Sequence, residues 1–105
     1  MGLVTVCGVA DVPAKGALCK RLADGTQISV ARIAGGDGRI AAFENRCPHV
    51  NGPLGLGKIV GSTVTCPWHF FRFDIRSGEA VGLPSTMRLR VFPTLVNERQ
   101  IYIDV

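Results

Sequence analysis

Apolar and polar residues alternate along much of this 105-residue chain, and a period of two is typical of β-strands that bury one face. The clearest example is the end of the chain, where Ile101 and Ile103 alternate with Tyr102 and Asp104. The pattern predicts an all-β fold whose short strands, rich in Val, Ile, Thr and Phe, lie at Leu3–Cys7, Ile28–Ala34, Arg39–Phe43, Ser62–Cys66, Phe70–Ile75, Arg88–Phe92 and Gln100–Val105.

Turn residues separate these segments. Hairpin turns are predicted at Gly35–Gly38, Arg76–Gly78 and Asn97–Arg99. The segment Ala14–Leu22 indicates a helical turn or two, although Gly16 lies inside it. Asn45–Gly61 is rich in Gly and Pro and has no sustained periodicity, so we expect a loop there. It is longer than compact domains usually tolerate unless the loop has a function.

Length and composition describe one globular domain, residues 1–105, since 47% of the residues are hydrophobic and 19% are charged. No apolar run approaches a membrane span, and Met1–Val6 does not resemble a secretory signal. We therefore expect a cytoplasmic protein with no membrane partner. In that reducing compartment, its four cysteines indicate metal binding rather than disulfides.

The net charge of +4 is modestly basic and favours partners with acidic surfaces. Nucleic-acid binding is not expected, because the arginines are scattered and no basic stripe is interleaved with aromatic residues. Five basic residues are candidate partner contacts, although each is more simply interpreted as part of a solvated strand or loop: Arg46, Lys58, Arg72, Arg88 and Arg90.

Two short motifs carry the candidate chemistry: Cys47-Pro48-His49, and Cys66-Pro67-Trp68-His69. They contain both histidines of the chain and two of its four cysteines. One such residue alone would more often be a buried cysteine or a hydrogen-bonded histidine, but four in two motifs favour a metal site. Two thiolates and two imidazoles suit tetrahedral zinc or an iron-sulfur cluster. Because each motif mixes the two ligand types, two metal ions fit better than one.

The set Cys47, His49, Cys66 and His69 resembles the motif of Rieske [2Fe-2S] proteins. The resemblance implies one [2Fe-2S] cluster, with both cysteines on an inner iron and both histidines on an outer iron. It also implies a Rieske fold: an antiparallel β-sandwich-like base and a small cluster-binding subdomain, about residues 45–84, made by two loops. Further matching segments are the run Phe70–Asp74, the hairpin Ser77–Glu79, and Leu83–Pro84 at the place of the family's proline loop.

Residues around the motif indicate which members of that family the chain resembles. High-potential members carry an extra cysteine in each cluster loop, where this chain has Gly52 and Trp68, and hydroxyl side chains where it has Phe71 and Phe73. Fewer donors to cluster sulfur lower the reduction potential, so we expect the low end of the Rieske range. The chain is most similar to the small ferredoxins of bacterial aromatic-ring dioxygenase systems. It departs from most of the family at Phe70, which replaces a glycine.

This resemblance implies an electron carrier rather than an enzyme. As a monomer, it would pass single electrons from an NAD(P)H-dependent flavoprotein ferredoxin reductase to a terminal Rieske oxygenase that dihydroxylates an aromatic compound. With both histidines used, no site of two histidines and one carboxylate can be assembled for oxygen chemistry. The alternative is a structural zinc-binding or nonredox Rieske-like regulatory module. Cys7 and Cys19 have no motif around them and are expected to be small buried hydrophobic residues.

Overall fold

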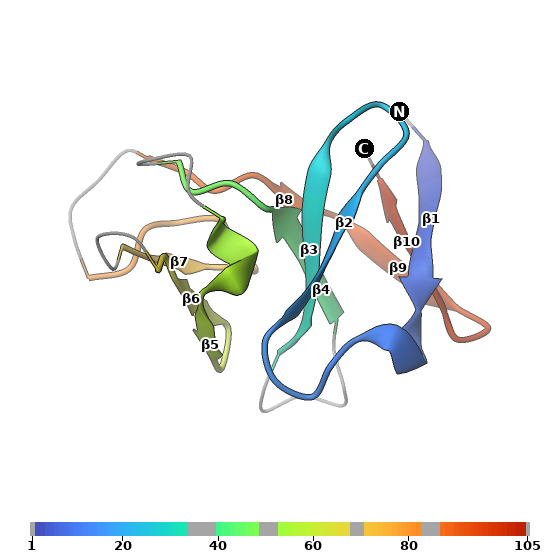
Figure 1. The fold of residues 1–105 in the computed structure, drawn as a ribbon, viewed down its shortest axis with the longest axis horizontal. Coiled ribbons are helices and arrows are strands. Elements are labelled where there is room, and N and C mark those ends of the chain that lie inside the picture. Colours follow the sequence, from blue (N-terminus) through green and yellow to red (C-terminus); the bar gives the residue numbers. More distant parts are fainter. Residues whose placement is uncertain (1, 34–39, 49–52, 68–70, 83–86, 105) are drawn as a thin grey trace.

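The computed structural model describes residues 2–33, 40–48, 53–67, 71–82 and 87–104, and in it three antiparallel sheets lie side by side, the outer sheet at the right of Figure 1, the central sheet in the middle and the small sheet at the left. The outer sheet has the order β1 (Leu3–Gly8), β10 (Gln100–Asp104), β9 (Thr94–Asn97). The central sheet has the order β2 (Ala17–Arg21), β3 (Gln27–Arg32), β4 (Ile40–Glu44), β8 (Val91–Phe92). The small sheet has the order β5 (Lys58–Val60), β6 (Thr63–Thr65), β7 (Arg72–Asp74). Two short 3-10 turns are η1 (Val9–Asp11) and η2 (Leu54–Leu56).

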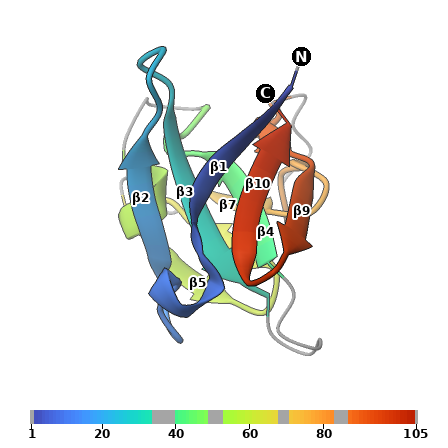
Figure 2. The same ribbon diagram turned by 90° about the vertical axis from the view of Figure 1, so that its right-hand side faces the viewer.

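The central sheet is buried on both faces, which explains the continuous run of buried residues in β3. Ile28 and Val30 face the outer sheet, whereas Ala31 faces the small sheet. The base core, between the outer and central sheets, contains Val6, Val12, Leu22, Ile28, Val30, Ala42, Phe92, Ile101 and Ile103. The site core, between the central and small sheets, contains Ala31, Ala41, Phe43, Cys47, Leu54, Val64, Cys66, Phe73, Ile75 and Leu89. Figure 2 looks onto the outer sheet, with the other two sheets behind it.

The predicted all-β class is confirmed, and a strand overlaps each predicted segment. The predicted hairpin at Asn97–Arg99 is confirmed as well. Glu98 and Arg99 have φ of 50° and 64°, and Asn97 pairs with Gln100, which is the geometry of a two-residue type I′ turn. The turn at Arg76–Gly78 is present but leads only to isolated bridges. The predicted turn at Gly35–Gly38 lies outside the described residues.

The helical turn predicted at Ala14–Leu22 is wrong, because the segment forms the edge strand β2, in which Leu18 pairs with Val30. Its good helix-forming residues are overridden by this pairing, and Gly16 adopts a φ of 79° just before the strand. Besides β2, two strands were not predicted. β5 lies within the predicted loop Asn45–Gly61, and β9 follows directly after Pro93. Each is short and mostly exposed, so neither shows a clear alternating pattern.

Candidate metal centre

Cys47 and Cys66 reach the same apolar region from two different sheets. Cys47 follows β4 of the central sheet, and Cys66 follows β6 of the small sheet. Each is completely buried, and both belong to the site core together with Phe43 and Phe73. The fold thus places two thiols in one water-excluded core, although they are far apart in the sequence.

Neither of these two thiols is joined in a disulfide. Thiolates suit iron and zinc, and an apolar shell around metal-bound thiolates limits solvent access. The donor chemistry therefore fits an iron-sulfur cluster held partly by Cys47 and Cys66. Several other residues of the predicted centre lie outside the described residues: His49, Gly52, Trp68, His69, Phe70 and the pair Leu83–Pro84. Within the described ranges, no three His, Cys, Asp or Glu side chains gather into a metal site, so the imidazole half stays a prediction.

The loop that carries Cys47 is tied down on both sides. The Asn45 backbone N–H donates to the Gln27 carbonyl at 2.9 Å, and the Arg46 N–H donates to the Glu44 carbonyl at 2.7 Å. The Asn45 side chain continues this anchoring, because its Oδ1 accepts the Gly55 N–H at 2.7 Å. The position of Cys47 is therefore fixed by β3 on one side and by η2 on the other.

Gly55 lets η2 lie directly against the central sheet. A Cβ at this position would lie 2.1 Å from Ser29 Oγ and 2.6 Å from Cys19 Sγ, so no larger residue fits without movement. Its neighbour Leu54 is completely buried in the site core. Sequence analysis missed the role of Gly55, and the only signal for it was the repeated glycine in the Gly-Leu-Gly segment ending at Gly57.

The second loop is closed by a short backbone hydrogen bond from the Cys66 N–H to the Phe71 carbonyl at 2.6 Å. Phe73, which follows on β7, is completely buried in the site core. Behind β7, Gly78 has a φ of 83°, and a Cβ there would lie 2.3 Å from the Leu89 carbonyl oxygen. The Leu89 N–H in turn donates to the Gly78 carbonyl at 2.8 Å. These contacts fix β7, on which Phe73 lies and which Phe71 directly precedes.

The prediction that Cys7 and Cys19 are both buried is wrong. Cys19 is exposed on the edge strand β2, with its Sγ 3.4 Å from Ser29 Oγ, and Cys7 is only half-buried. Burial raises the pKa of the Cys7 thiol, as does the charge of Asp11, while Lys20 acts in the opposite direction. Neither cysteine belongs to the site core, so both differ in setting from Cys47 and Cys66.

The basic residues singled out as partner contacts are all exposed: Arg46, Lys58, Arg72, Arg88 and Arg90. Arg90 also lies 4.8 Å from the centre of the Phe92 ring, a cation–π distance. No helix among the described residues has the length and apolar character needed to cross a bilayer.

Comparison with known proteins shows which family the chain resembles. The model of the family "Rieske [2Fe-2S] domain" matches residues 2–93. The ferredoxin component of the p-cumate 2,3-dioxygenase system of Pseudomonas putida is 35% identical over 104 residues, which covers 98% of this chain and 86% of that protein.

Two solved structures extend the similarity to the fold. The Sphingomonas yanoikuyae B1 ferredoxin superposes with a TM-score of 0.87 at 25% identity, covering 99% of both chains. A chain from a complex of reduced oxygenase and oxidized ferredoxin in carbazole 1,9a-dioxygenase gives a TM-score of 0.84, also at 25% identity. It covers 96% of this chain and 100% of the other.

Proposed function

Since the chain belongs to the family of Rieske [2Fe-2S] ferredoxins, we propose that it carries single electrons to a terminal oxygenase that dihydroxylates an aromatic compound. The observation that carries the proposal is the pair of completely buried cysteines, Cys47 and Cys66, which two separate loops hold in one core without a disulfide. The electron donor in this proposal is an NAD(P)H-dependent flavoprotein ferredoxin reductase.

In this proposal Cys47 and Cys66 bind the inner iron of one [2Fe-2S] cluster, and His49 and His69 bind the outer iron. When bound, such a cluster takes up and releases one electron. The chain's own residues supply a rigid, dry setting. Phe43, Leu54 and Phe73 exclude water around the thiolates, and the ladders of the central and small sheets hold the two loops in place. A setting that moves little between oxidation states keeps electron transfer fast.

The reduction potential is proposed to lie near the low end of the Rieske range, about −150 mV. Phe71 and Phe73 occupy the positions where high-potential members of the family carry hydroxyl groups, and phenyl rings cannot donate hydrogen bonds to cluster sulfur. Without those donors the added negative charge of the reduced state is less stabilised.

The proposed partners bind transiently to a monomeric cytoplasmic protein. A solved relative at 25% identity was found in a complex of ferredoxin and oxygenase, which supports a terminal oxygenase as the electron acceptor. The exposed basic residues suit acidic docking surfaces, whose attraction would speed encounter more than it would strengthen the complex. Both histidines are assigned to the cluster, so the chain itself performs no oxygen chemistry.

The test is chemical analysis and anaerobic reduction of the purified full chain. We expect about two irons and two acid-labile sulfides per chain, and an electron paramagnetic resonance spectrum after dithionite reduction that is characteristic of mixed Cys and His ligation. The reduced protein should then pass its electron to the oxygenase of the p-cumate system, measured by the recovery of visible absorbance. A colourless zinc protein that gives no such spectrum, even after iron and sulfide reconstitution, would contradict the proposal.

A further inference from the structure

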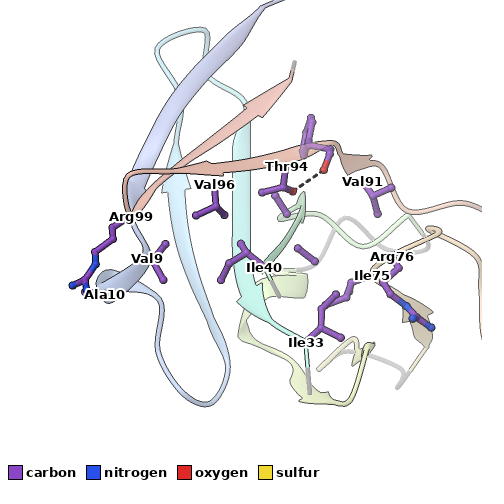
Figure 3. A pocket seen from close by; sticks show the side chains of 13 residues that line it. Val9, Ala10, Ile33, Ile40, Ile75, Arg76, Val91, Thr94, Val96 and Arg99 are labelled. Carbon is purple, nitrogen blue, oxygen red and sulfur yellow. Dashed lines mark hydrogen bonds between the residues drawn. The ribbon is translucent and has the colours of Figure 1, made fainter. Parts of the chain in front are cut away.

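One cavity that the described residues line lies away from the metal centre. It is an open groove of about 830 Å³ between the outer and central sheets, and neither Cys47 nor Cys66 lines it. Most of the residues that line it are isoleucines, valines and alanines, and one arginine lies toward each end, as Figure 3 shows. The residues that matter for the argument are Ile33, Ile40, Ile75, Val96, Arg76 and Arg99.

Within the described ranges, two strand edges at this groove have no strand neighbour. The ladder between β4 and β8 pairs Ala42 with Phe92 and Phe43 with Val91, and it extends no further toward Ile40. After Pro93 the chain changes sheets and continues as β9, which within the described part of the chain pairs only with β10. The N-terminal part of β4 and the outer edge of β9 therefore offer backbone N–H and C=O groups to another extended segment.

Apolar side chains at the groove are more exposed than their place in the sandwich predicts. Val96 pairs with Ile101, whose side chain is completely buried in the base core, yet 48% of Val96 is exposed. Ile33 and Ile40 are also only partly buried, at the adjoining ends of β3 and β4. An occupant with apolar side chains would remove this surface from water, at about 25 cal/mol per Å² of area buried.

The charges at the groove are positive. Arg99 lies at one end beside η1, and Arg76 lies at the other end behind β7 (Figure 3). Arg76 Nε is 3.7 Å from Asp74 Oδ1, but 58% of its side chain is exposed, so most of its guanidinium faces water. Among the described residues, Arg99 forms no ion pair with a carboxylate. An occupant with carboxylates near both ends complements this pattern.

We propose that the groove binds an extended segment of a partner protein, apolar in the middle and flanked by Asp or Glu, which adds as a strand against β4 or β9. The unpaired strand edges favour a peptide over a small apolar acid, because only a peptide can use the free backbone groups. This surface is separate from the metal centre, so the inference does not depend on the proposed electron transfer.

The probe is the peptide acetyl-Glu-Val-Thr-Val-Thr-Val-Glu-amide, titrated into the oxidised, ¹⁵N-labelled full chain and followed by nuclear magnetic resonance. We expect saturable shifts of the Ile40, Val96 and Arg99 amides, with a Kd of about 10–500 μM, as for other short recognition segments. Arg99→Glu should weaken binding about tenfold. The matched control Arg21→Glu, on the exposed edge strand β2, should leave the Kd unchanged.

Three results would overturn the proposal. The first is the absence of shifts at these amides up to about 5 mM peptide, which would put any affinity below a useful range. The second is equal binding by a peptide N-methylated at its central residues, which would show that strand pairing is not used, or by 3-phenylpropionate, which would identify a site for small apolar anions. The third is movement of the same amides on simple dilution of the protein, which would identify a second copy of this chain as the occupant.

Discussion

The two cores of this molecule are enclosed by strands of different length. In the central sheet, β3 and β4 pair over five positions, whereas β5 and β6 of the small sheet pair over three. The base core lies between the outer and central sheets and has no fully buried cysteine, whereas the site core includes Cys47 and Cys66. Short ladders alone stabilise a sheet poorly, and metal ligation contributes directly to folding free energy. From this comparison we expect that the base can fold on apolar burial, while the small sheet depends on the proposed cluster.

The largest expected effect comes from removing one buried thiol. Cys66→Ser should reduce bound iron to less than a tenth of the wild-type content, because the hydroxyl is a poor ligand for this metal. Amides of β6 and β7 should then lose protection from hydrogen exchange, while those of β3 and β4 keep it. Iron analysis and hydrogen exchange followed by mass spectrometry measure the two effects.

The matched control is Cys19→Ser, which changes an exposed thiol outside both cores. It should retain full iron content and the wild-type exchange pattern. Retention of the cluster by Cys66→Ser would refute the ligand assignment. Equal loss of protection in all three sheets would show instead that the two cores unfold as one cooperative unit, and the contrast between them would fail.

Gly55→Ala tests the contact through which the central sheet supports the cysteine loop. The added methyl would lie 2.1 Å from Ser29 Oγ, so η2 must move and the hydrogen bond from Gly55 to Asn45 should weaken. We expect a loss of about 1–3 kcal/mol in the free energy of unfolding, as for other overpacked sites, and faster release of iron. Denaturation with guanidinium and loss of visible absorbance measure these changes.

Gly2→Ala is the control for that substitution, because its Cβ would meet no atom within 4 Å. It should change stability by less than about 0.5 kcal/mol. Wild-type stability and iron retention in Gly55→Ala would mean that η2 does not hold the Cys47 loop.

Much of the fold could be predicted because most strands bury one face or two. Ile101 and Ile103 alternate with more exposed residues in β10. In β3, the continuous run of buried residues from Ile28 to Ala31 fits a strand covered on both sides. The edge strands could not be predicted in the same way. In β2, Leu18 is only partly buried and Cys19 is exposed, so no periodic pattern distinguishes that segment from a helix. Strand pairing, which is a long-range interaction, decided its structure.

Only the metal ligands of the candidate site could be predicted from the sequence. The motif identifies Cys47 and Cys66, since soft ligands in a fixed spacing are visible in the sequence itself. The residues that position them are not visible, because Gly55 and Asn45 act through contacts with Ser29 and Gln27 on a strand distant in sequence. Such contacts depend on the packed fold, not on any local pattern.

Phe73→Tyr tests the difference between the site core and the base core through the reduction potential. Phe73 is completely buried in the site core, and a hydroxyl there can donate to cluster sulfur. One hydrogen bond worth about 1.4 kcal/mol more in the reduced state would raise the midpoint by ~59 mV for one electron. Voltammetry of the immobilised protein measures the shift. The control Phe92→Tyr, in the base core, should leave the potential unchanged, and an equal shift in both variants would show that the hydroxyl acts at long range.

The smallest expected effect concerns acid stability in the base, at the turn between β2 and β3. Asp24 Oδ1 accepts the Thr26 N–H at 2.8 Å, and this hydrogen bond lowers the pKa of the Asp24 carboxyl. A carboxyl whose pKa is lower in the folded state contributes stability that is complete above its unfolded pKa, about 3.9, and is lost as the pH falls through the folded value.

Asp24→Asn keeps a side-chain acceptor but cannot titrate, so its stability should fall less steeply than that of the wild type below about pH 4. Asp24→Ala also loses the turn and should be less stable than Asp24→Asn at pH 7. Urea denaturation of each protein across this pH range, followed on the outer and central sheets, measures both differences in stability. Because the group is fully exposed and is not part of the site core, iron release in acid should follow the same course in all three proteins, and a difference in that course would mean that the turn at Asp24 is coupled to the site core.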